Sequence, residues 1–123
     1  MRVIKKILIV EDEILSSIWM NDFLTEEGYC VCRPVTTGEQ AVKAAKDESP
    51  DIIFMDIHLA GPMDGIEAAK TIHDQFGIPI IFMTGYSNSD IFEQVRGISP
   101  VTCLDKPIQV SDIENAIAVA RNY

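Results

Sequence analysis

The sequence lacks the long apolar stretches of a membrane protein and has few positive charges. None of its hydrophobic runs approaches the roughly 20 residues that a helix needs to cross a bilayer. Lysine and arginine total 10 against 19 aspartates and glutamates, which gives a formal net charge of −9. That charge disfavours binding to nucleic acid phosphates or to anionic membranes. The N-terminus leads directly into a strand-like run instead of a targeting segment, so we expect a cytoplasmic protein.

Cysteine is also scarce, because the chain has only Cys30, Cys32 and Cys103. An odd count without the spacing of a disulfide framework predicts free thiols in a reducing compartment. A structural zinc site needs about four ligands, and only His58 and His73 are available to join the cysteines. The spacing of these residues does not suit such a site, so we discount structural zinc.

What the sequence does contain is a series of apolar runs that end at polar residues. With 123 residues, 47% of them hydrophobic, the chain is predicted to form one globular domain over residues 1–123. Short runs rich in Ile and Val are typical of strands buried on both faces of a parallel sheet. Helical patterns alternate with them, which predicts an α/β fold with a five-stranded parallel sheet, doubly wound by (βα)5 units into a three-layer sandwich. The predicted strands are Ile7–Val10, Tyr29–Val35, Ile52–Met55, Ile80–Met83 and Val101–Leu104.

Apolar spacing and capping residues predict the helices between these strands. Apolar side chains recur every three or four residues after the first strand, which predicts one buried stripe on the first helix. This stripe consists of Leu15, Ile18, Trp19 and Phe23. The later helices are expected to begin with capping pairs, namely Thr37 with Gln40, Asp64 with Glu67, and Ser111 with Glu114.

One helical segment is only weakly predicted, and the last helix has an apolar face with two possible roles. Tyr86–Gly97 is polar at its start and is the weakest helix prediction in the chain. The last helix has one apolar face, which would also suit a homodimer, although such a face usually packs on the core. That face is formed by Val110, Ile113, Ile117 and Ala120.

Three acids follow strands whose carboxyl ends should lie at one edge of the sheet. Glu11 and Asp12 follow the first strand and Asp56 follows the third. Such neighbours would repel one another and raise each other's pKa unless a cation neutralised them. Mg²⁺ prefers oxygen ligands and is often held by one or two carboxylates together with a phosphate. A helix cap at Asp12 and a solvated Glu11 would explain each acid alone, but the three together favour a metal site.

Asp56 is also the best candidate for a nucleophile. It stands directly after the most apolar central strand, and a carboxylate can attack phosphorus to form an aspartyl phosphate. Lys106 would supply a positive charge to one phosphoryl oxygen, and the Thr84 hydroxyl would donate a hydrogen bond to another. Taken singly, Thr84 is an ordinary strand residue and Lys106 an ordinary surface lysine. The set as a whole predicts phosphoryl chemistry at Asp56.

These motifs, in this order and spacing, resemble the receiver domain of two-component response regulators, the family that includes chemotaxis regulators. The resemblance covers essentially the whole chain and implies a flavodoxin-like fold. It implies that Asp56 is the phosphoacceptor and that Mg²⁺ is bound by Glu11, Asp12, Asp56 and the backbone carbonyl of His58. It further implies that Thr84 and Lys106 contact the phosphoryl group and that the Lys106–Pro107 peptide is cis. The matching segments are Ile7–Glu13, Phe54–Asp56, Met63–Glu67, Phe82–Thr84 and Leu104–Pro107.

The chain departs from the family pattern at three places. Cys103 stands where the family usually has the aromatic ring that swings inward during switching, and a thiol is too small for that role. Cys103 is expected to be a small buried hydrophobe. The loop Leu59–Met63 is one residue longer than the commonest version, and Gly85 follows Thr84 where alanine is frequent.

Two residues flank the expected site and are predicted to set the rate of dephosphorylation. They are His58 and Tyr86, which stand two positions beyond Asp56 and Thr84. In the family, such positions tune how fast water attacks the acyl phosphate.

The function implied is a phosphorylation switch, not a conventional enzyme. A sensor histidine kinase or phosphotransfer protein would donate the phosphoryl group, and the domain would assist its own phosphorylation and hydrolysis. The added charge would alter the surface of the fourth helix, fifth strand and last helix, and so the binding of a downstream protein.

Three alternatives stay open from the residues alone. One is a receiver-like adaptor with little phosphotransfer, and another is a small Mg²⁺-dependent phosphohydrolase. The phosphohydrolase would usually need a second acid near the nucleophile, whereas residue 58 is histidine. The third is a flavin- or nucleotide-binding module, which would need a phosphate loop in place of the acidic residues 11–13.

Overall fold

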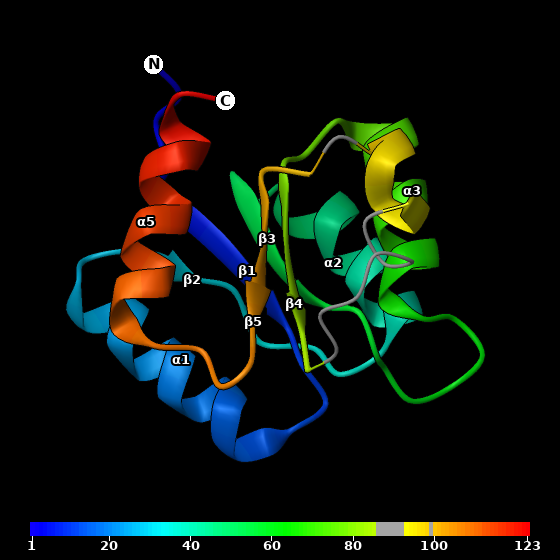
Figure 1. The fold of residues 1–123 in the computed structure, drawn as a ribbon, viewed down its shortest axis with the longest axis horizontal. Coiled ribbons are helices and arrows are strands. Elements are labelled where there is room, and N and C mark those ends of the chain that lie inside the picture. Colours follow the sequence, from blue (N-terminus) through cyan, green and yellow to red (C-terminus); the bar gives the residue numbers. More distant parts are fainter. Residues whose placement is uncertain (86–92, 99) are drawn as a thin grey trace.

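A computed structural model describes residues 1–85, 93–98 and 100–123 of the chain. Five parallel strands form one sheet in the order β2-β1-β3-β4-β5, which confirms the predicted doubly wound, three-layer fold (Figure 1). This strand order is the flavodoxin-like one. The strands are β1 (Lys6–Val10), β2 (Cys30–Val31), β3 (Ile52–Asp56), β4 (Ile80–Thr84) and β5 (Thr102–Asp105). The helices of the described part are α1 (Ile14–Glu26), α2 (Gly38–Glu48), α3 (Gly65–Phe76), α5 (Val110–Arg121) and the short 3-10 helix η1 (Arg96–Ile98).

The three central strands are apolar on both sides because helices cover both faces of the sheet. Every residue of β3 and β4 is buried, and so are the last four residues of β1. Successive side chains point to opposite faces, so each strand contributes to two separate cores. Helices α2 and α3 cover one face and α1 and α5 the other (Figure 1). Leu8 and Ile53 pack on the α2–α3 face, whereas Ile9 and Phe54 pack on the α1–α5 face.

Strand β2 is much shorter than the predicted Tyr29–Val35. Only Cys30 and Val31 form a continuous ladder with β1, and the chain pairs again at a single bridge between Val35 and Val10. Pro34 interrupts the segment, and proline has no backbone N–H to give to a ladder. The edge strand therefore ends early, but the chain still follows the sheet to its carboxyl edge.

The predicted buried stripe on α1 is wrong. Leu15, Ile18 and Trp19 are exposed, whereas Ser17, Met20 and Leu24 form the buried face. The helix carries apolar residues on two faces, and the sheet receives the one that periodicity did not select. Phe23 lies between them, partly buried against the core and stacked on the Trp19 ring at 6.3 Å.

The caps of α2 and α3 lie where the sequence predicts them. The Thr37 hydroxyl accepts a hydrogen bond from the Gln40 N–H at 3.1 Å, and the Asp64 carboxylate accepts one from the Glu67 N–H at 2.9 Å. The left-handed Gly77 ends α3.

The predicted start of α5 is wrong by two residues. Its N-cap is Gln109, whose N–H donates to the Asp112 carboxylate at 2.9 Å, so the pair Ser111 and Glu114 does not cap the helix. Val110 is exposed, and the buried face consists of Ile113, Ala116, Ile117 and Ala120.

Residues 86–92 of the predicted helix Tyr86–Gly97 lie outside the described residues. Residues 93–95 are helical and lead into η1. Among the described residues, no helix combines the length and the hydropathy that crossing a membrane would require.

Candidate functional site

The carboxyl ends of four strands bring the predicted site residues to one edge of the sheet. Glu11 directly follows β1, Asp56 ends β3, Thr84 ends β4 and Lys106 directly follows β5. The sheet register aligns Val10 with Met55, and Thr84 with Asp105. The fold therefore places these polar residues on adjacent strands, as the sequence predicts.

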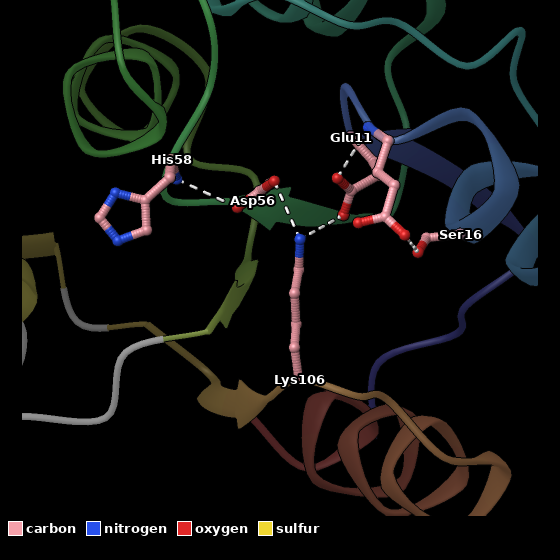
Figure 2. A network of polar contacts seen from close by, with 6 residues as sticks. Glu11, Ser16, Asp56, His58 and Lys106 are labelled. Atoms are coloured by element: carbon pink, nitrogen blue, oxygen red, sulfur yellow. Dashed lines mark hydrogen bonds and ion pairs between the residues drawn. The ribbon is translucent and has the colours of Figure 1, made fainter.

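Lys106 joins the two buried acids of this edge. Its Nζ lies 2.8 Å from Glu11 Oε2 and 3.0 Å from Asp56 Oδ2 (Figure 2). Glu11 is 1% exposed and Asp56 is 3% exposed, so both carboxylates are removed from most of the solvent. Two further backbone groups support them, because the Glu13 N–H donates to Glu11 and the His58 N–H to Asp56, both at 3.0 Å.

The site has more negative charge than Lys106 can neutralise. Burial raises the pKa of Glu11 to about 7, with a further increase from Asp56 and an opposing effect of the Lys106 hydrogen bond. Burial lowers the pKa of Lys106, but its hydrogen bonds to Glu11 and Asp56 outweigh this effect and raise the pKa overall. Lys106 therefore stays protonated at neutral pH, while Glu11 would ionise more readily if a second cation were present.

Glu11, Asp12 and Asp56 form the acidic group that a metal ion would need. Each offers a carboxylate oxygen, and these oxygens all lie within 4.8 Å of one another. Asp12 is exposed, so the group opens to solvent on one side. Hard oxygen donors, an open side and unneutralised charge all suit Mg²⁺, which usually keeps several of its waters. The residues present therefore fit the ion that receiver domains bind.

His58 and Thr84 lie beside this acidic group in different ways. The His58 ring is exposed and points away from Glu11 and Lys106, while its backbone faces Asp56 (Figure 2). Thr84 is 1% exposed, and its carbonyl accepts the Lys106 N–H at 2.8 Å, which ties the end of β4 to the lysine. The Lys106–Pro107 peptide is cis, as the family resemblance implies. Tyr86 lies outside the described residues.

The family departures have clear positions in the structure. Cys103 lies opposite Phe82 in the β4–β5 register and is half-buried, and burial raises the pKa of its thiol. It packs against the α2–α3 core, which agrees with the predicted role as a small hydrophobe. In the longer loop, Leu59 is buried and Met63 is partly buried, while residues 60–62 between them are exposed.

Sequence reasoning missed a groove beside the site, which we call the α1 groove. It has a volume of about 510 Å³, and its apolar walls include Leu15 and Trp19 of α1 and Pro107 and Ile108 after β5. Glu11, Glu13 and Lys106 also line it, so the groove is continuous with the acidic site. A signal was present in the sequence, because Met20 and Leu24 form a second apolar row on α1 that competes with the first.

Comparison with known proteins agrees with this geometry. Residues 7–118 match the family described as response regulator receiver domain. The transcriptional regulatory protein PdtaR of Mycobacterium tuberculosis is 35% identical over 116 residues, which cover 94% of this chain and 56% of that protein. The sporulation initiation phosphotransferase F of Bacillus subtilis is 32% identical over 115 residues, which cover 92% of this chain and 90% of that protein. The chain thus spans only about half the length of PdtaR.

Solved structures give the same result. The signal receiver domain of a modulated diguanylate cyclase from Desulfovibrio desulfuricans superposes with a TM-score of 0.89 and 32% identity, over 98% of this chain and 95% of that one. A CheY-like receiver domain from Methanospirillum hungatei has a TM-score of 0.88 at 24% identity, which supports the fold. The acids at the carboxyl edge and the matched sequence over nearly the full length agree, and the chain belongs to the response regulator receiver domain family.

Proposed function

We propose that this receiver domain accepts a phosphoryl group on Asp56 from a histidine kinase or phosphotransfer protein in the cytoplasm. The observation that carries the proposal is the Lys106 ammonium held between two buried carboxylates, 3.0 Å from Asp56. A carboxylate oxygen of Asp56 attacks the phosphorus of a phosphohistidine. The phosphorus–nitrogen bond breaks, and its electron pair returns to the imidazole of the donor.

The chain has residues to hold Mg²⁺ for this step. Glu11, Asp12, Asp56 and the His58 carbonyl would hold the ion, which when bound neutralises charge on the transferring phosphoryl oxygens. The His58 N–H keeps one Asp56 oxygen oriented from the other side. Asp56 is therefore fixed by both its backbone position in β3 and its hydrogen bonds before any donor arrives.

Lys106 and Thr84 would act on the phosphoryl group itself. Lys106 can exchange its contact with Asp56 for one with a phosphoryl oxygen while it stays near Glu11. The Thr84 hydroxyl stands on the next strand and would donate to a second oxygen. By these contacts the domain assists its own phosphorylation and the later attack of water on the aspartyl phosphate, which releases inorganic phosphate and restores the Asp56 carboxylate.

The same contacts would transmit the phosphorylated state. A phosphoryl group adds a charge of roughly −1.5 to −2, which attracts the Lys106 ammonium and the Thr84 hydroxyl. Both residues belong to the β4–β5 side of the sheet, and their movement would alter the surface formed by β5 and α5. A downstream protein would then bind one state more tightly than the other.

The α1 groove is the surface on which we expect the phosphodonor to dock. Exposed Leu15 and Trp19 lie beside Lys106, so a protein covering them would stand next to Asp56. Because the chain is strongly acidic, the donor should combine apolar side chains with basic ones. The buried face of α5 already packs on the core, so it does not by itself call for a homodimer.

Intact mass spectrometry tests the proposal directly. The protein is incubated with Mg²⁺ and acetyl phosphate and compared with Asp56→Asn. A single acid-stable, base-labile phosphoryl adduct is expected, which requires Mg²⁺ and is absent in the variant. A folded, Mg²⁺-binding protein without any adduct from acetyl phosphate or a phosphorylated kinase would contradict the proposal and favour an adaptor role.

A further inference from the structure

The loop between β3 and α3 determines how the backbone around Asp56 is presented. It spans residues 57–64 and is closed by a hydrogen bond from the Gly65 N–H to the Ile57 carbonyl at 3.0 Å. His58 lies in this loop, and its N–H donates to Asp56 Oδ1. Because the proposed metal ligand is the His58 carbonyl, the path of this loop also determines where that ligand lies.

Gly65 holds one end of the loop by a very close approach. A Cβ at this position would overlap the Asp56 carbonyl oxygen and would lie 2.9 Å from Ile57 Cα. These are backbone atoms, so they could not yield by rotating a side chain. The first turn of α3 therefore rests directly on the backbone of the phosphoacceptor.

Gly38 contacts the loop near the same end, at Met63, from a different helix. It is the buried first residue of α2, and a Cβ there would lie 2.7 Å from both the carbonyl oxygen and Cγ of Met63. The Met63 side chain could move, but its carbonyl could move only with the loop. The Thr37–Gln40 cap fixes the start of α2, so the helix cannot easily retreat.

We propose that Gly38 is a positioning residue for metal binding, acting through Met63 on the loop that carries His58. The inference rests on the proposed function, since it assumes that the site holds Mg²⁺. A methyl group at residue 38 would displace the Met63 backbone, because a packed interior responds to added volume with backbone shifts. Because Gly65 fixes the residues that follow Met63, the displacement would pass back along the loop toward His58.

The loop in this chain gives the contact particular importance. The loop is one residue longer than the commonest family version, and its residues 60–62 are exposed. Leu59 and Met63 are the two apolar side chains on either side of that exposed part, and Met63 lies against Gly38 of α2. Without the contact at Gly38, the half of the loop before Gly65 would lose its support from the neighbouring helix.

A Mg²⁺ titration of the Gly38→Ala variant, followed by amide NMR shifts, tests the inference. We expect the amide signals of residues 57–64 to move even without Mg²⁺, and Mg²⁺ to bind about tenfold more weakly than to the wild type. Gly97→Ala is the matched control, since an added Cβ there has nothing within 4 Å.

The outcomes separate this inference from the proposed function. If Gly38→Ala binds Mg²⁺ within twofold of the wild type, the positioning role is wrong, whatever happens at Asp56. If the wild type itself binds no Mg²⁺, the proposed function and the inference both fail. Should Gly38→Ala not fold, Met63→Ala alone decides, because loss of the support should weaken Mg²⁺ binding several-fold, and unchanged binding would overturn the inference.

Discussion

The two faces of the sheet are covered in different ways. On one face, α2 and α3 approach the sheet and each other through glycine and alanine, and their close contacts support the loop after Asp56. The other face is covered by α1 and α5 (Figure 1). There the α1 groove lies between α1 and the segment after β5, and Leu15, Ile18 and Trp19 are exposed. The contacts of the closed face support the loop that carries His58, and the open face is the side on which we propose that the phosphodonor docks.

The largest expected difference between the faces is in stability. Ile72 on α3 is fully buried, whereas Ile18 on α1 is 52% exposed. Truncating a buried isoleucine costs about 2–5 kcal/mol, whereas exposed positions usually change stability by less than about 0.5 kcal/mol. Urea unfolding of Ile72→Ala and Ile18→Ala measures both values. Equal losses would show that the apolar row of α1 is packed in solution, and the comparison would fail.

A second prediction concerns Glu11, which directly follows β1 and lines the α1 groove. Its folded pKa of about 7 lies above the ordinary 4.5, so the folded state holds this proton more tightly than the unfolded chain does. The resulting stabilisation is complete below pH 4.5 and is lost as the pH rises through 7. Without Mg²⁺, the loss between pH 4.5 and 7.5 should be on the order of 3 kcal/mol.

Chemical unfolding in a chelator, repeated across this pH range, measures that loss. The Glu11→Gln variant is the control, because it keeps the shape of the side chain but cannot ionise. Subtracting its pH dependence from that of the wild type isolates Glu11 from the other acids. A difference that is flat with pH, or that rises with pH, would contradict the raised pKa.

A third prediction addresses the open face. Trp19 is 40% exposed and lines the α1 groove with Pro107 and Ile108. Trp19→Ala should slow phosphotransfer from a protein donor by about tenfold, since aromatic side chains often dominate interfaces. The rate with acetyl phosphate should not change. Val119→Ala is the matched control, because Val119 is an exposed apolar residue of α5 that does not line the groove.

The smallest expected effect is on the lifetime of the phosphorylated form. The His58 ring is exposed at the edge of the site, on the loop that the closed face supports. His58→Ala should change the rate of dephosphorylation several-fold without preventing phosphorylation, and Tyr86→Ala should have a similar effect. Decay of the purified phosphorylated protein measures both. If neither variant alters the lifetime, these residues do not control the access of water.

The sheet and its polar edge were predictable because the relevant signals are local. An Ile-rich run is apolar on both sides only when helices cover both faces, and the polar residue that ends the run must then lie at the sheet edge. Asp56 and Thr84 follow such runs directly, so the sequence alone indicates that they lie near each other at the sheet edge. Lys106 was harder to predict, since its run is weaker and β5 is only partly buried.

The orientation of α1 was not predictable in this way. Its two apolar rows are similar in strength, and the choice between them depends on how the helix starts. Glu13 begins the helix, with its N–H bound to Glu11 and its carboxylate accepting from Ser16 at 2.9 Å. Glu11 is in turn held by Lys106, so the start of the first helix is linked to a residue near the other end of the sequence. The Gly38–Met63 approach is equally non-local.

The contact of Lys106 with Glu11 and Asp56 has a consequence for biosynthesis. Both acids are made early, but the lysine that joins them follows β5 and is added near the end of synthesis. A domain generally folds as a unit, so the pair of buried acids and the ammonium between them form together, only after the last part of the chain has been made.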